Sequence, residues 1–168
     1  MINSDIFKQA MSQYAAGVTV ITTVHQEKPI GITATSFSSL SLDPPLVIVN
    51  LSKKLFTHQV ILESGIFAVN MLKSSQKELG MRFAGMIPGV EDRFEGLDVK
   101  TAVTNSPILT NSLAWVDCRV WATYEGGDHT IFVGEVVDVN SSSDGVPLVY
   151  SNRQWQGVSE LEGNEENN

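Results

Sequence analysis

The segment that decides the fold is residues 17–51, which read GVTVITTVHQEKPIGITATSFSSLSLDPPLVIVNL. Residues 17–24 alternate valine with threonine or isoleucine, and such a β-branched run is typical of a strand. The turn QEKP leads into a second expected strand at residues 30–37. After Pro44 and Pro45, residues 46–51 are so apolar that we expect a strand buried on both faces. Successive strands joined by short turns predict an antiparallel sheet.

The rest of the chain adds further strands and a few short helices. We expect a helix capped by Ser4 or Asp5, a second at residues 55–63, and a third opened by a capping box of Ser75 and Glu78. Further strands are expected at residues 66–71, 113–124, 130–139 and 148–150. The 113–124 and 130–139 strands flank a Gly-rich turn and form a hairpin, with Val116, Cys118, Val120, Ala122 and Tyr124 on one face. The chain is therefore predicted to be mainly β with short helices, as an antiparallel barrel or sandwich.

Composition narrows the classes of function. The 168 residues carry a formal net charge of −8, which argues against nucleic acid as a partner. We find no basic and apolar leader and no apolar run long enough for a membrane span, so we expect a cytoplasmic protein. Cys118 is the only cysteine, and the three histidines are scattered, so no metal site is predicted. We expect one domain at residues 1–157 and a disordered acidic tail at 158–168.

Three polar features are candidates for chemistry. Residues 33–41 read TATSFSSLS and combine hydroxyl groups with exposed backbone donors, although such runs are also common in solvated turns. Ser52, Lys53 and Lys54 follow the apolar strand, where they can hold a phosphate or simply lie on the surface. His129 ends the hairpin turn, where it can meet a ligand or remain exposed. No G-x-G-x-x-G, P-loop or G-x-S-x-G motif is present, so standard nucleotide cradles and a serine hydrolase are not predicted.

The chain resembles the flavin reductase-like family. The resemblance rests on residues 17–51, then on FAVNML, DRF, AWVDCRV, GDHTIFVGEV and PLVY, and it extends from about Ala10 to Trp155. It implies a split β-barrel, FMN-binding fold, a homodimer, and NADH- or NADPH-dependent reduction of FMN or FAD. It also implies that a flavin-dependent oxygenase component receives the reduced flavin.

The same resemblance implies roles for particular residues. The cofactor would be met by Thr33, Ala34, Thr35, Ser36, Ser39, Ser41, Asn50, Leu51, Ser52, Lys53, Lys54, Phe83, Arg93 and Phe94. The nicotinamide nucleotide would be met by His129, with Tyr150 and Arg153 close to the same mouth. Thr35 stands where many relatives carry Asn, which leaves the choice between FMN and FAD open.

No catalytic acid or base is expected, because the cofactors carry the chemistry of hydride transfer to flavin N5. Two other functions fit the same features. The chain can be a flavoprotein that binds FMN tightly and acts as an electron carrier or as a reductase of another acceptor. It can also be a non-enzymatic flavin- or haem-binding module on the same barrel.

Overall fold

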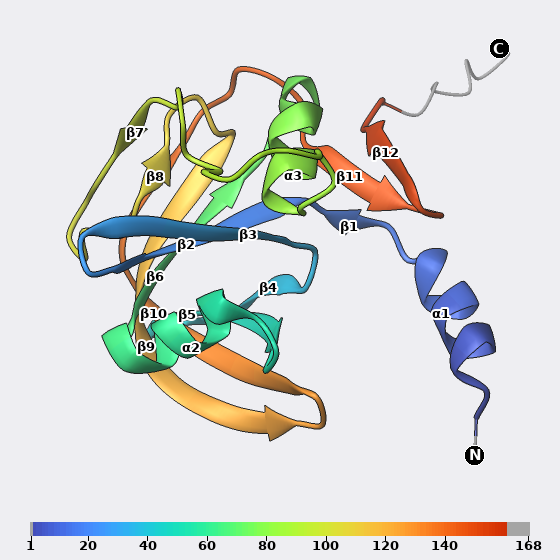
Figure 1. Cartoon of the computed structure of the whole chain (residues 1–168), viewed down its shortest axis with the longest axis horizontal. Coiled ribbons are helices and arrows are strands. Elements are labelled where there is room, and N and C mark those ends of the chain that lie inside the picture. Colours follow the sequence, from blue (N-terminus) through green and yellow to red (C-terminus); the bar gives the residue numbers. More distant parts are fainter. Residues whose placement is uncertain (1, 161–168) are drawn as a thin grey trace, which may run out of the picture.

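A computed structural model describes residues 2–160, which fold around one long, strongly curved antiparallel sheet (Figure 1). The helical elements are α1 (Ser4–Ser12), α2 (Phe56–Ser64), the 3-10 turn η1 (Ser74–Gln76) and α3 (Lys77–Phe83). The strands are β1 (Ala16–Gly17), β2 (Thr19–His25), β3 (Lys28–Ala34), β4 (Phe37–Leu42), β5 (Pro45–Ser52), β6 (Ile66–Met71), β7 (Val99–Lys100), β8 (Ile108–Leu109), β9 (Ala114–Gly126), β10 (His129–Ser141), β11 (Leu148–Ser151) and β12 (Gln154–Gly157).

The main sheet has the order β3-β2-β6-β9-β10-β5-β4, and its neighbouring strands are antiparallel. Its edge strands β3 and β4 do not pair with each other, so the sheet curls without closing. Two smaller sheets, β1-β11-β12 and β7-β8, lie beside it. This arrangement confirms the predicted fold class, a mainly β protein with short helices and a split barrel.

Strand β2 separates two apolar cores. On one side Ile21 packs with Phe67 and Phe132, and on the other side Val20 packs with Phe83. All five of these side chains are fully buried, and burial of each contributes roughly 1.5–3 kcal/mol. The two cores hold the sheet in its curved shape and fix the elements that carry the polar features.

The long β9–β10 hairpin is present as predicted, but the side chains of β9 are distributed over its two faces differently from the prediction. Val120 lies opposite Gly134 and Ala122 lies opposite Val133, so the β9 strand carries a bulge at Trp121. Because an extra residue reverses the alternation of side chains, Ala122 and Tyr124 do not share the face of Cys118 and Val120. The expected single face of β9 is therefore wrong beyond the bulge.

Other local expectations are corrected by the backbone. Helix α1 is capped by Asn3, whose side chain accepts from the Asp5 N–H at 2.8 Å. Helix α3 follows a 3-10 turn in which the Gln76 side chain accepts from the Lys73 N–H at 2.9 Å, in place of the expected Ser75–Glu78 box.

The strand expected at residues 30–37 ends at Ala34, and a separate strand, β4, begins at Phe37. On β5, buried Val47, Val49 and Leu51 alternate with half-buried residues, so burial on both faces is not observed in this chain. Helix α2 ends as predicted at Gly65, which has φ 69°.

Within residues 2–160, no helix is long and apolar enough to cross a membrane. No cluster of three or more His, Cys, Asp or Glu side chains there could hold a metal ion. Of the expected acidic tail, residues 161–168 lie outside the described part of the chain.

Candidate functional site

The hydroxyl-rich segment begins where β3 leaves the main sheet. The Thr33 hydroxyl donates to the Gly80 carbonyl at 2.7 Å, and the Thr19 hydroxyl donates to the carbonyl of buried Ala34 at 2.8 Å. These bonds anchor the end of β3 to α3 and β2. Thr35 is exposed and follows the anchored residues directly, so it is the side chain at this end that is free to meet a ligand.

Ser36 connects this segment to β5. Its hydroxyl donates to the Asn50 carbonyl at 2.7 Å, and its own carbonyl accepts from the Asn50 N–H at 3.2 Å. Further along β4, Ser39 is exposed and Ser41 is half-buried, on either side of a bulge in the pairing with β5. The segment therefore lies along β5 as a strand with hydroxyl groups at its surface.

Asn50 carries a buried polar atom that is not satisfied within residues 2–160. Its side-chain Oδ1 has no hydrogen-bond partner there, although the residue as a whole is only half-buried. A buried acceptor without a partner is costly, so the Asn50 Oδ1 is available to a donor from outside the chain, whether an ordered water or a ligand. A flavin ring offers an N–H at N3 between two carbonyl groups, and an amide matches that edge.

The β9–β10 hairpin brings its tip to the end of β5. His129 lies opposite Ser52 in the strand register, and the Lys53 N–H donates to the Asp128 carbonyl at 3.0 Å. The Lys53 ammonium forms an ion pair with Glu125 and donates to the Gly127 carbonyl at 2.8 Å. Two features that lie far apart in sequence thus form one surface.

The two lysines have different surroundings. Lys53 is held by the hairpin, as described above. Lys54 is exposed, and its backbone N–H donates to the Ser52 hydroxyl at 3.4 Å. Of the pair, Lys54 is therefore the cation that is available to an anionic group, whereas Lys53 fixes the hairpin.

His129 is oriented by its neighbour. Its Nδ1 lies 2.7 Å from Asp128 Oδ1, and this hydrogen bond lowers the pKa of the exposed Asp128 carboxyl below its ordinary value. Since Nδ1 is engaged, Nε2 is the ring nitrogen left to meet a ligand. The turn therefore presents an imidazole edge beside Lys54.

Helix α2 supports this surface from behind. The His58 Nε2 lies 2.8 Å from the Thr130 hydroxyl, and both residues are buried. Burial lowers the pKa of His58, with a smaller contribution from Lys53 that Glu125 partly opposes. The N-terminus of α2, at Leu55, has no side-chain cap, so its free backbone N–H groups add donors next to Lys54.

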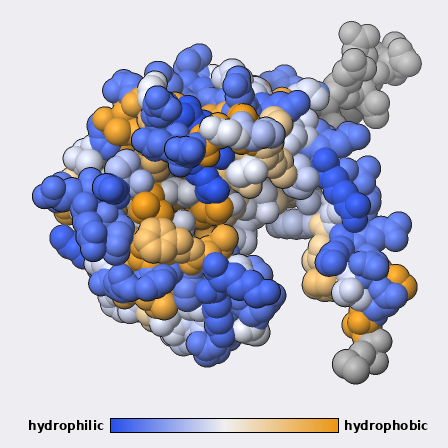
Figure 2. Space-filling view, in the orientation of Figure 1, coloured by the Kyte–Doolittle hydropathy of each residue, from blue (hydrophilic) through white to orange (hydrophobic). Residues whose placement is uncertain are grey.

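A pocket of about 310 Å³ lies between β3, the start of α2 and residues 91–94. Figure 2 shows apolar side chains at its position between β3 and α2. Arg93 borders the pocket, and its Nη1 donates to the carbonyls of Gly31 at 3.2 Å and Phe83 at 2.9 Å. The pocket therefore lies between the Arg93–Phe94 pair and the N-terminus of α2, which follows Lys54 in the chain.

Phe83 lies deeper than its expected role requires. It is fully buried against Gly31, and its ring meets Phe94 edge to face at 4.9 Å between centroids. Phe83 therefore has no exposed surface in this chain and supports Phe94 and Arg93 from beneath. Leu51 and Ala34 are likewise buried, and they can meet a ligand only through their backbone groups.

Tyr150 and Arg153 lie elsewhere in the chain. Tyr150 on β11 pairs with Ala16 and meets Trp155 edge to face at 5.1 Å. Arg153 lies in the β11–β12 turn with φ 59°. Figure 1 shows β11 and β12 at the upper right and the β9–β10 tip at the bottom. Within one chain, the expected shared mouth of His129, Tyr150 and Arg153 is not formed.

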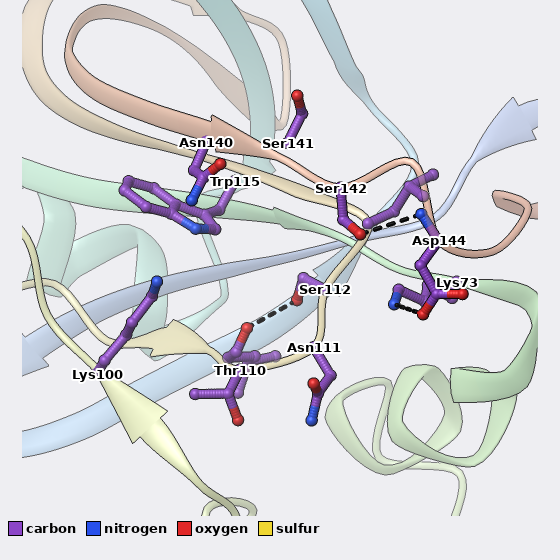
Figure 3. Close-up of a pocket in the computed structure, with 12 residues that line it drawn as sticks. Lys73, Lys100, Thr110, Asn111, Ser112, Trp115, Asn140, Ser141, Ser142 and Asp144 are labelled. Carbon is purple, nitrogen blue, oxygen red and sulfur yellow. Dashed lines mark hydrogen bonds and ion pairs between the residues drawn. The ribbon is translucent and has the colours of Figure 1, made fainter.

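A second pocket, of about 260 Å³, was not indicated by the sequence (Figure 3). Lys100 lies over the Trp115 ring at 5.0 Å from its centroid, and Lys73 pairs with Asp144 at 3.1 Å. Both lysines already have partners, and no predicted site residue lines this pocket. The candidate site therefore remains the surface around Ser36, Asn50, Lys54 and His129.

Sequence reasoning missed three residues that support the site. Glu125 holds Lys53, His58 holds Thr130, and the Arg82 Nη2 donates to the carbonyls of Asp92 at 3.1 Å and Glu95 at 2.8 Å. Glu125 and His58 contact side chains that are distant in the sequence, and Arg82 contacts backbone carbonyls, so neither kind of partner is visible in a sequence motif. Only the opposite charges of Lys53 and Glu125 could have suggested one of these contacts.

The fold and the site together define a split-barrel protein with a surface suited to a ring-bearing, phosphorylated ligand. Residues 11–159 match the family model described as flavin reductase like domain. The chain belongs to this family, which confirms the resemblance drawn from the sequence.

Named relatives agree with this assignment. The chain is 36% identical over 159 residues to the flavin-dependent monooxygenase reductase subunit HsaB of Mycobacterium tuberculosis, covering 94% of this chain and 83% of that protein. It is 38% identical over 149 residues to the FMN reductase (NADH) SmoA of Agrobacterium fabrum, covering 89% of this chain and 83% of that protein.

A solved structure agrees as well. The NADH:FAD oxidoreductase SgcE6 of Streptomyces globisporus C-1027, in complex with NAD and FAD fragments, superposes with a TM-score of 0.87 at 29% identity. The match covers 96% of each chain.

Proposed function

We propose that this protein reduces FMN or FAD with NADH or NADPH and supplies the reduced flavin to a partner flavin-dependent monooxygenase. The enzyme class follows from the family and its named relatives: the chain is an NAD(P)H:flavin oxidoreductase that uses flavin and NADH. The transfer to a partner oxygenase is supported by similarity to HsaB, which is named as a monooxygenase reductase subunit.

One observation carries the proposal for this site. The hydroxyl-rich segment, the end of β5 and the hairpin tip, which are separate in sequence, meet along Ser36, Asn50, Ser52 and His129. The unsatisfied Asn50 Oδ1 and the exposed Lys54 then provide, on one surface, an acceptor for a flavin ring and a cation for its phosphate.

When bound, the nicotinamide supplies a hydride that the flavin accepts at N5. The residues of this chain bind and orient. We assign the pyrimidine edge of the flavin ring to Asn50 and its phosphate to Lys54 and the α2 N-terminus. His129 contacts the nicotinamide nucleotide through Nε2. No side chain of the site is required as an acid or base, so the protein acts by placing the two rings in contact and excluding water between them.

We further propose that the protein works as a homodimer, because within one chain β11 and β12, which carry Tyr150 and flank Arg153, lie apart from the β9–β10 tip that carries His129 (Figure 1). A second chain can supply these residues to the same mouth. Since the reaction consumes nicotinamide nucleotides, we also propose that the protein acts in the cytoplasm.

The test is steady-state oxidation of NADH and NADPH with added FMN, FAD or riboflavin. We expect turnover that depends on added flavin, and release of bound flavin on dialysis. A protein that stays yellow after extensive dialysis and oxidises no NAD(P)H would instead be a flavoprotein that carries electrons.

The variant His129→Ala tests the nicotinamide contact. We expect a KM for NADH that is raised about tenfold to a hundredfold, and a flavin Kd that changes less, because one hydrogen bond to a charged group contributes about 1.5–3 kcal/mol. Unchanged NADH kinetics would show that His129 has no part in binding.

A further inference from the structure

Helix α1 projects away from the rest of the chain (Figure 1). None of its residues is buried. Its apolar side chains recur at helical spacing and form one stripe, with exposed fractions of 64% for Ile6, 56% for Phe7 and 54% for Met11. Ile2 before the helix is 82% exposed, and Tyr14 after it is 74% exposed. Exposed apolar stripes of this kind mark sites of protein association.

The chain itself does not cover this stripe. Residues Asp5, Gln9, Ser12 and Gln13 line a pocket of about 380 Å³ together with the turn at Asn152 and Arg153. The polar face of α1 is therefore the one turned toward the Asn152–Arg153 turn. Figure 2 shows an open gap between α1 and the barrel, with apolar side chains of α1 along it.

Few contacts hold α1 in this position. The Asn152 N–H donates to the Ser12 carbonyl, and the Gln13 side chain donates to Asn152 Oδ1 at 3.3 Å. A helix of nine residues is too short to persist in water without packing, since isolated helices below about 12–15 residues are marginal. The helix therefore requires a surface that covers its apolar stripe.

We propose that α1 is an arm that packs its apolar stripe, formed by Ile6, Phe7, Met11 and Tyr14, on a second copy of this chain. The proposal rests on the homodimer proposed above and assigns the element that holds it. Because the base of the arm is bonded to Asn152, the turn that carries Arg153 is brought to the same interface.

The area is sufficient for a stable dimer. Buried aromatic side chains cover about 150–250 Å² each and large aliphatic ones somewhat less, so the stripe together with Ile2, all more than half exposed, offers roughly 600 Å². In a two-fold arrangement each copy gives one arm and receives another, and each arm also covers an equal area of its partner. The total is about 2,000 Å² or more, at or above the upper end of standard interfaces at about 1,200–2,000 Å². A one-sided contact with a different protein would bury only half of this.

The experiment uses the full chain and the double variant Phe7→Asp, Met11→Asp, compared by sedimentation velocity over a range of concentrations. We expect a dimeric wild type and a variant whose dimer Kd is raised roughly a hundredfold or more, because central apolar anchors carry most of the binding energy. Far-UV circular dichroism should show the β signal of the barrel unchanged, since these side chains do not contact the core.

The control is Leu62→Asp, which places one aspartate, in place of the two in the arm variant, on an exposed leucine of α2 that is 51% accessible. We expect this variant to remain dimeric. A dimeric arm variant would overturn the role of α1 while leaving the homodimer intact. A monomeric wild type would overturn both proposals, and dissociation of the Leu62→Asp control as well would show that the effect is not specific to the arm.

Discussion

Ser36 and Asn50 exchange two hydrogen bonds across the β4–β5 edge of the sheet. The Asn50 N–H donates to the Ser36 carbonyl at 3.2 Å, and the Ser36 hydroxyl donates to the Asn50 carbonyl at 2.7 Å. The pair holds the backbone of Asn50 in place while its Oδ1 remains without a partner in the described chain. The hydroxyl-rich segment thus has a structural task, to orient the one amide that the proposed ligand needs.

Replacing Ser36 with alanine tests this relationship. We expect Ser36→Ala to lower the free energy of unfolding by about 1 kcal/mol, the usual loss for one hydrogen bond, and to weaken flavin binding. Urea unfolding and flavin fluorescence titration measure the two effects. The control is Ser38→Ala, because the exposed Ser38 hydroxyl donates only to the neighbouring Ser39 carbonyl at 3.1 Å. Equal flavin affinity in both variants would contradict the positioning role of Ser36.

The two lysines after β5 should differ in their effects. We expect Lys54→Ala to raise the Kd for FMN about tenfold and to leave the Kd for riboflavin nearly unchanged, because riboflavin has no phosphate. Lys53→Ala should weaken NADH binding as well, since it releases Glu125 and the hairpin. Isothermal titration with FMN, riboflavin and NADH separates these outcomes. Equal losses for FMN and riboflavin in Lys54→Ala would exclude a phosphate contact.

Gly31 is required by close packing rather than by its backbone angles. A Cβ at this position would lie 2.7 Å from a ring carbon of Phe83 and 3.2 Å from a ring carbon of Phe94. We expect Gly31→Ala to destabilise the protein by about 1–3 kcal/mol, because the rings and the bond from Arg93 to Gly31 must shift. The control Gly17→Ala adds a Cβ with nothing within 4 Å. Chemical denaturation of both variants compares their unfolding midpoints. Similar midpoints would refute the close-packing requirement at Gly31.

His58 should make stability depend on pH. Its pKa is lowered in the folded protein by burial, whereas unfolding returns it to about 6.5. Between the folded and unfolded pKa values of His58, the unfolded chain binds more protons than the folded protein. The contribution of neutral His58 to the free energy of unfolding is therefore complete above pH 6.5 and is lost as the pH falls toward the folded pKa. We expect His58→Gln to lose less stability than the wild type between pH 7 and pH 5, since glutamine can keep a bond to Thr130 without titrating.

The control for this measurement is His25→Gln, which removes a half-buried histidine at the end of β2. Thermal unfolding across the pH range gives the slopes. If His58→Gln and the wild type lost stability in parallel, the buried imidazole would have no share in the pH dependence.

Much of the fold was readable in the chain because its signals are local. The β-branched run of residues 17–24, the Gly-containing hairpin turn and the stop of α2 at Gly65 depend on neighbouring residues, and the structure confirms each of them. The bulge at Trp121 was not readable, because a bulge is defined by the pairing of two strands. The division of residues 28–42 into β3 and β4 also depends on which strands pair, so it was not readable either.

The candidate site likewise has local features that the sequence shows and long-range contacts that it does not. Its polar segments were predicted from residue type alone, since hydroxyl groups, paired lysines and a turn histidine can each be recognised within a short segment. Tertiary structure decided their relations: Lys53 is held by Glu125, Lys54 is free, and Phe83 lies under Gly31. Those outcomes depend on which strands lie side by side, because burial and charge pairing arise between segments distant in the chain. The sheet order placed β5 beside β10, and that placement brought His129 opposite Ser52.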